Sequence, residues 1–216
     1  PTLPLTPLLF IGFVPLLLVQ DEISKADGKG LFKYAYNTFV LWNILTTFWV
    51  ANTAFVAGIV AIWLNAFFMC VPFILFHWTK KYTPRLSFLA FIVYWLSFEY
   101  LHLNWEISWS WLTLGNSLAT FPSWAQWYEY TGALGGSLWI LSLNVVAFLA
   151  VQHYLKTEKR MALRRGITFL AVAIVPIAVS LVLYFKYEEQ GEAVEVVVVQ
   201  PNYEPHYEKF DVPERE

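Results

Sequence analysis

The sequence predicts an all-α polytopic membrane protein with about six transmembrane helices, followed by a β-strand near the C-terminal end. Hydrophobic residues make up 58% of the 216 residues and charged residues 14%, whereas a soluble domain is about 45–50% apolar and about 25% charged. The mean hydropathy is +0.51. The other two reasons are a series of long apolar stretches and a strong asymmetry of charge between the loops that separate them.

The apolar stretches are long enough to cross a bilayer, because a spanning helix needs roughly 20 mostly apolar residues, with a range of about 17–25. The second stretch contains two asparagines, and only Ala51, Asn52 and Thr53 separate it from the third. We therefore expect these two helices to form an antiparallel pair. The predicted spans are Leu3–Val19, Tyr34–Val50, Ala54–Trp78, Leu86–Leu103, Leu134–Leu155 and Ile167–Phe185.

Positive charge lies in alternate loops. Of the 14 Lys and Arg residues, 11 lie within Asp21–Lys33, Lys80–Arg85 and Lys156–Arg165. The loop Asn104–Ala133 has none. Because cytoplasmic loops carry an excess of Lys and Arg, we expect the three basic loops to be cytoplasmic. Asn104–Ala133 and the tail after Phe185 then face the other side, and residues 1–185 form a transmembrane helical domain.

The tail changes character at Lys186, after which it is strongly acidic. Val194–Val199 is apolar and β-branched apart from Glu195, which predicts a strand buried on both faces. A helix lying on the membrane is the alternative, but the run has no polar helical face. A buried strand needs partner strands. Residues 186–216 are therefore interpreted as a linker and the start of a further, incomplete domain.

The loop Asn104–Ala133 is rich in aromatic residues, and we expect it to be folded and half-sunk in the interface, where it lines a groove for lipid chains. Trp and Tyr also gather at interfaces as simple belts, which is the alternative. Glu99 and His102 are three positions apart and share a helix face. They form either a polar patch beside a substrate groove or a pair that satisfies itself near the outer interface. The loop's Trp residues are at positions 105, 109, 111, 124 and 127.

The sequence offers no sign of a cofactor, a metal or a nucleic-acid partner. The chain's one cysteine, Cys70, lies in an apolar stretch, where a thiolate is disfavoured, so we interpret it as a buried structural residue. The four His residues are scattered and show no metal-ligand spacing. The net charge of −2 gives no basic patch for nucleic acid.

Several stretches, in their order and spacing, resemble the apolipoprotein N-acyltransferases. The chain departs from the family pattern at His102-Leu103, where the family often has Arg-Gly, and at Ser110, Asn116 and Pro201, which replace a proline, a tyrosine and a glycine. The matching stretches are Phe98-Glu99-Tyr100-Leu101, Trp111-Leu112-Thr113-Leu114-Gly115-Asn116, Gln126-Trp127 with Gly132 and Gly135, Val199-Gln200-Pro201-Asn202, and Lys209-Phe210.

The resemblance implies the membrane domain of an enzyme of the bacterial inner membrane. Family members transfer an acyl chain from a phospholipid, through a cysteine thioester, to the N-terminal amine of a diacylglyceryl-cysteine lipoprotein. Their Glu–Lys–Cys triad lies in a periplasmic nitrilase-like domain of the α/β class, whose first strand Val194–Val199 resembles. None of the triad can be placed here, so the chain looks truncated at both ends and inactive alone. The candidate substrate-binding residues are Glu99, His102, Trp105, Trp111, Gly115, Asn116, Gln126 and Trp127.

Two other functions remain open from the sequence. A small transporter or channel would need ionisable residues at mid-membrane depth, usually with inverted repeats, and the sequence shows only the off-centre Glu99. A non-catalytic membrane scaffold would need neither.

Overall fold

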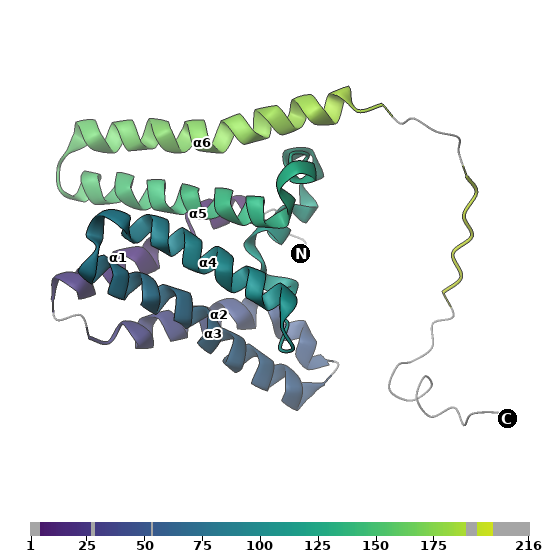
Figure 1. Cartoon of the computed structure of the whole chain (residues 1–216), viewed down its shortest axis with the longest axis horizontal. Coiled ribbons are helices and arrows are strands. Elements are labelled where there is room, and N and C mark those ends of the chain that lie inside the picture. Colours follow the sequence, from purple (N-terminus) through teal and green to yellow (C-terminus); the bar gives the residue numbers. More distant parts are fainter. Residues whose placement is uncertain (1–4, 27–28, 53, 189–193, 201–216) are drawn as a thin grey trace. The chain divides into compact units, whose positions relative to one another are not determined.

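The computed structural model describes residues 5–26, 29–52, 54–188 and 194–200. The chain divides into two units, residues 1–186 and 187–216, and the helices belong to the first. The α-helices (Figure 1) are α1 (Val14–Lys25), α2 (Leu31–Thr47), α3 (Phe55–Tyr82), α4 (Ser87–Asn104), α5 (Tyr128–Leu155) and α6 (Lys159–Lys186). Short 3-10 helices are η1 (Thr6–Phe10), η2 (Phe48–Asn52), η3 (Pro84–Leu86), η4 (Ser110–Leu112), η5 (Leu114–Thr120) and η6 (Pro122–Trp124).

Helix α5 is the centre of the bundle. It contacts α1, α4 and α6, together with η1 and η5, and 56% of its most apolar stretch is buried, against 6% for α6. Helix α6 runs alongside α5 and leaves most of its surface exposed (Figure 1). Between α1, α2, α3 and α4 the core is aromatic: the buried Phe13 ring lies 4.8 Å from Trp95 and 5.7 Å from Phe91 in edge-to-face contacts, each contributing about 0.5–1.5 kcal/mol beyond burial.

The predicted number of spans is only partly supported. Among the described residues, five helical stretches are long and apolar enough to cross a membrane, and α2 falls short. Its 17 residues extend about 26 Å at 1.5 Å per residue, less than the roughly 30 Å of a bilayer core. The chain continues from it as the 3-10 helix η2. The five stretches are Thr6–Lys25, Phe55–Tyr82, Pro84–Asn104, Tyr128–Leu155 and Lys159–Lys186.

Helices α2 and α3 form the antiparallel pair expected from the short connection, of which Thr53 lies outside the described residues. The Tyr36 hydroxyl donates to the Trp63 carbonyl at 3.4 Å, and Asn65 Nδ2 donates to Asn43 Oδ1 at 2.8 Å. Near the turn, a Cβ on Gly58 would lie 2.8 Å from Ala51 Cα, so glycine permits the close approach of the two backbones.

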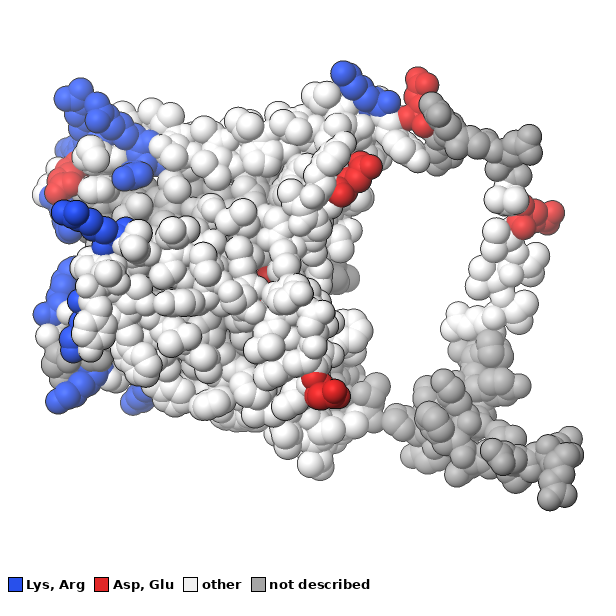
Figure 2. Space-filling view, in the orientation of Figure 1, with Lys and Arg blue, Asp and Glu red and all other residues white. Residues whose placement is uncertain are grey.

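Most of the Lys and Arg side chains of the helical unit gather at one end (Figure 2), whereas Lys186 ends α6 at the other. The basic end carries the α1–α2, α3–α4 and α5–α6 connections (Figure 1). The charge pattern of the sequence therefore corresponds to a real separation in space, with the basic end opposite the aromatic loop between α4 and α5.

The predicted strand is not confirmed. Residues 194–200 carry no strand assignment, and Val194 and Val196 to Val199 are each at least 75% exposed. A strand is defined by hydrogen bonds to a neighbouring strand, and no segment that the structure describes pairs with this one. The predicted matches at Pro201, Asn202, Lys209 and Phe210 lie outside the described residues.

A polar cluster joins three helices at the basic end. Asp21 of α1 accepts hydrogen bonds from Lys80 of α3 at 2.8 Å and from Gln152 of α5 at 3.0 Å, and Lys25 lies 2.9 Å from it. Lys80 also donates to Gln20 at 2.9 Å. Gln20 and Asp21 are buried, so this cluster fixes the positions of α1, α3 and α5 relative to one another.

We predict that Lys80→Met lowers the free energy of unfolding by about 1–3 kcal/mol, because it leaves buried polar groups with a missing partner while keeping an apolar stem. The measurement is thermal unfolding in detergent, followed by tryptophan fluorescence. Lys81→Met is the matched control, since Lys81 is exposed. Equal melting temperatures for both variants would contradict a stabilising cluster.

Candidate functional site

The connection between α4 and α5 is a folded loop. Three short helices, η4, η5 and η6, pack respectively against α4, α5 and α6. Residues 105–127 thus cover the end of the bundle opposite the basic loops, and two hollows lie beneath and beside them.

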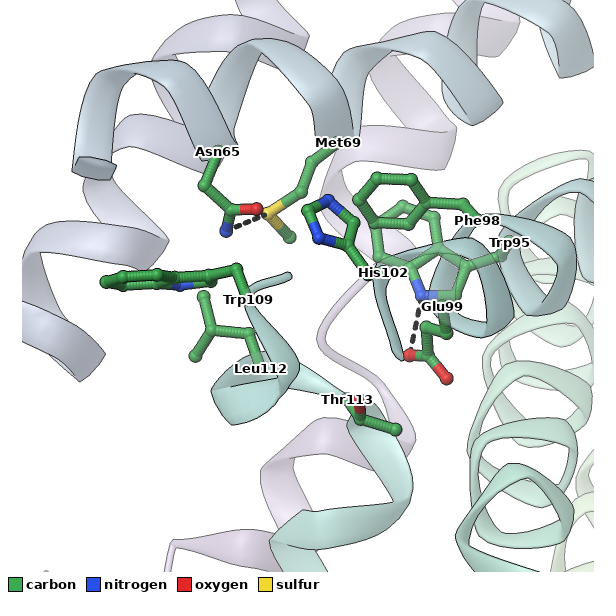
Figure 3. Close-up of a pocket in the computed structure, with 9 residues that line it drawn as sticks. All are labelled: Asn65, Met69, Trp95, Phe98, Glu99, His102, Trp109, Leu112 and Thr113. Carbon is green, nitrogen blue, oxygen red and sulfur yellow. Dashed lines mark hydrogen bonds between the residues drawn. The ribbon is translucent and has the colours of Figure 1, made fainter. Parts of the chain in front are cut away.

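Glu99 attaches this loop to α4. Its Oε1 atom accepts a hydrogen bond from Trp95 Nε1 at 3.0 Å, one turn earlier in the helix (Figure 3). It also accepts one from the Leu114 backbone N–H at 2.9 Å. The Glu99 side chain is buried. Within the described residues no hydrogen bond joins Glu99 to His102, so of the two alternatives the pair that satisfies itself is not supported.

The next residue, Gly115, attaches the loop to α5. Its N–H donates to Ser137 Oγ at 2.9 Å, and its carbonyl accepts from the Tyr128 hydroxyl at 2.9 Å. A Cβ on Gly115 would overlap the Ala133 carbonyl oxygen. Glycine is therefore required by the contact between the two backbones.

His102 lies in an aromatic surrounding beside a small pocket. Its ring is 4.5 Å from that of Phe98 and 4.9 Å from that of Trp105. The pocket holds about 10 Å³, between α3, α4 and the start of the loop (Figure 3). Its lining residues are Asn65, Met69, Trp95, Phe98, Glu99, His102, Trp109, Leu112 and Thr113.

A larger hollow of about 190 Å³ lies between α2 and the segment that contains η1 and the start of α1. Apart from Thr38 and the indole nitrogen of Trp42, its lining is apolar, and Leu114 brings the outer loop to it. We call it the apolar groove. Its lining residues are Leu9, Gly12, Phe13, Leu16, Thr38, Phe39, Leu41, Trp42, Leu45, Met69 and Leu114.

The other predicted site residues lie elsewhere on the loop. Trp111 is 63% exposed and meets Trp49 of η2 edge to face at 5.3 Å. Asn116 is exposed and donates to the Ser110 carbonyl. Gln126 contacts α6, where its N–H donates to Ser180 Oγ at 2.6 Å. Trp127 contacts α5, where its ring lies 5.8 Å from that of Trp139. The structure therefore brings together Glu99, His102, Trp105 and Gly115, and separates the remaining four.

Sequence reasoning missed the partners that complete this site. Trp95 lies one helical turn before Glu99, a spacing at which side chains meet, so the contact between them could have been predicted from the sequence. Ser137 and Leu114 were not, because their contacts depend on how the loop folds back. Cys70 is buried within α3, 1% exposed, and across the described residues no group of His, Cys, Asp and Glu is arranged to hold a metal.

The helical unit, with its basic end and its folded aromatic loop, defines a polytopic α-helical membrane protein. The apolipoprotein N-acyltransferase N-terminal domain matches residues 1–146, and the chain belongs to this family. It is 31% identical over 219 residues to the apolipoprotein N-acyltransferase of Chlorobaculum tepidum, a match that covers 98% of this chain and 39% of that protein. No solved structure matches the chain. This membership does not favour a transporter, a channel or a scaffold.

We predict that Glu99→Leu destabilises the loop, at a cost of about 1–3 kcal/mol for each N–H left unpaired. Thermal unfolding gives the loss, and protease cleavage within residues 105–127 reports release of the loop. Glu99→Gln keeps an oxygen that accepts both hydrogen bonds and is expected to resemble the wild type. Cleavage of both variants at the wild-type rate would show that Glu99 does not hold the loop.

Proposed function

We propose that this chain is the membrane portion of an apolipoprotein N-acyltransferase, which moves an acyl chain from a phospholipid to the N-terminal amine of a diacylglyceryl-cysteine lipoprotein. Family membership supports the reaction class. The observation that supports a role for this chain is the apolar groove, which lies against the folded loop and offers a place for a lipid chain.

The groove is suited to an acyl chain that arrives from the bilayer. Leu41 and Leu45 on its α2 side are 57% and 67% exposed, so they lie on a surface that lipid would cover. At the other side Leu114 belongs to the loop that Glu99 holds. A chain in the groove would therefore lie in contact with the loop, near the end of the bundle where we place the headgroup region and the acyl ester.

The nucleophile of the reaction is assigned to a part of the protein outside these 216 residues. A thioester requires a cysteine whose thiolate is activated by a neighbouring base. The chain's one cysteine, Cys70, is buried in the apolar core beside Phe73 and Met69, where such activation is absent. We propose that residues 186–216 lead from the helices into the periplasmic nitrilase-like domain that carries the Glu, Lys and Cys.

We predict that filling the groove slows acyl transfer. Gly12 lines the groove, and a Cβ there meets nothing closer than 3.5 Å, so Gly12→Leu should occupy the groove without disturbing the backbone. The expected loss is about tenfold or more, equivalent to a barrier raised by about 1.4 kcal/mol. The assay is transfer of a labelled phospholipid acyl chain to a diacylglyceryl peptide by the intact natural protein.

Two controls accompany this variant: Gly12→Ala adds only a methyl group, and Gly166→Leu adds the same side chain to α6, where a Cβ meets nothing within 4 Å. Both are expected to be active. Full activity of Gly12→Leu would remove the groove from the mechanism. An intact wild-type protein that transfers no acyl chain would contradict the proposed reaction itself.

We also predict the orientation, with the basic end cytoplasmic in the bacterial inner membrane and the aromatic loop periplasmic. In a Cys70→Ala background, Thr120→Cys in the loop should react with a membrane-impermeant maleimide in intact spheroplasts. Thr157→Cys, between α5 and α6, should react only after the membrane is opened. The reverse labelling pattern would invert the topology.

A further inference from the structure

Within the part of the chain that the structure describes, three buried nitrogen atoms of residues that line the small pocket have no hydrogen-bond partner, and neither does Glu99 Oε2, which also lines it. The nitrogen atoms are Nδ1 and Nε2 of His102 and Nε1 of Trp109. His102 is 3% exposed. Buried polar side chains nearly always have a partner, and leaving one unpaired costs about 1–3 kcal/mol. The pocket therefore calls for a ligand that supplies hydrogen bonds.

The chemistry of the lining defines that ligand. An indole N–H only donates, whereas a neutral imidazole has one donor and one acceptor. A partner for both residues must accept a hydrogen bond from Trp109 and also interact with the His102 ring. No Lys or Arg is among the residues that line the pocket, and apart from Glu99, Asn65 and Thr113 these side chains are apolar or aromatic, His102 included. The Glu99 carboxyl group disfavours an anion and can accept a further hydrogen bond at Oε2. A small neutral group that both donates and accepts fits this set.

The pocket has room only for a very small molecule that both donates and accepts hydrogen bonds. Its volume of about 10 Å³ is close to the least that holds one water molecule. Figure 3 shows the His102 imidazole and Trp109 bordering the same space, with Asn65 on one side and Leu112 on the other. Asn65 and Thr113 add further polar atoms to the lining, in keeping with the two to four partners that a buried water requires.

We propose that this pocket binds one water molecule, which accepts a hydrogen bond from Trp109 Nε1 and bridges it to the His102 ring. Trp109 belongs to the outer loop and His102 to α4. The water is then a second attachment of the loop to this helix, next to the direct one made by Glu99, and His102 is a positioning residue that acts through it. This site is independent of the acyl-transfer proposal.

A high-resolution structure of the intact natural protein in lipid nanodiscs tests the site directly. We expect one isolated density peak, roughly 2.7–3.2 Å from both Trp109 Nε1 and a His102 ring nitrogen. An empty pocket, a direct hydrogen bond between the two side chains, or density continuous with a lipid headgroup would each overturn the proposal.

A double-mutant cycle on the same protein tests the bridge in solution, with His102→Phe, Trp109→Phe and the double variant. Each single variant should lower the melting temperature, because one partner of the water is lost. The double variant should lose less than the sum of the two, since removing both side chains leaves neither of them as an unpaired partner of the other. Trp111→Phe, at an exposed position, should change little and is the control. Additive losses, or no loss in the single variants, would overturn the bridge.

Discussion

The Oε1 atom of Glu99 joins two parts of the molecule that are far apart along the chain. Its hydrogen bond to the Leu114 N–H fixes the residue at which the outer loop turns from α4 toward α5. Gly115 then meets α5 backbone to backbone, and Leu114 reaches the apolar groove. The wall of the groove and the roof of the small pocket thus depend on one carboxylate oxygen. A carboxyl group at this depth is costly, and the two N–H donors to Oε1 offset part of that cost.

Buried backbone groups near the start of the chain also need hydrogen-bond partners from side chains. Helix η1 (Thr6–Phe10) and α1 (Val14–Lys25) are separate segments, and the Phe13 N–H at their junction takes a side-chain acceptor. Asn144 of α5 contacts both sides of the junction: its Oδ1 atom accepts from the Phe13 N–H at 2.7 Å, and its Nδ2 atom donates to the Leu9 carbonyl at 2.6 Å. That carbonyl also accepts from the Gly12 N–H at 3.3 Å. Irregular backbone within a membrane is tolerated only where protein surrounds it. This explains why an amide side chain lies in the middle of the most buried helix.

Much of the helical fold could be predicted from the sequence, because an apolar run of sufficient length has few alternatives in a bilayer. Ala54–Trp78 was expected where α3 (Phe55–Tyr82) lies. Helix α6 begins at Lys159, before the expected Ile167, since its basic first turns are helical without being apolar. The site was harder to predict. Glu99 and His102 do share a helix face, but Glu99 bonds to a backbone N–H 15 positions away, and no local spacing encodes such a contact. The strand was inferred from the β-branched run Val194–Val199 and from its resemblance to a strand of the family, whereas the strands that would pair with it were not identified.

The gathering of most Lys and Arg residues at one end of the helical unit has a consequence for its orientation in a membrane. Turning the unit over would carry these side chains through the bilayer, and each costs about 2.5–3.5 kcal/mol at its centre. The energies of so many charges accumulate into a barrier that thermal motion does not cross. The orientation of the helical unit in the membrane is therefore set while the chain is being inserted, and it does not change afterwards.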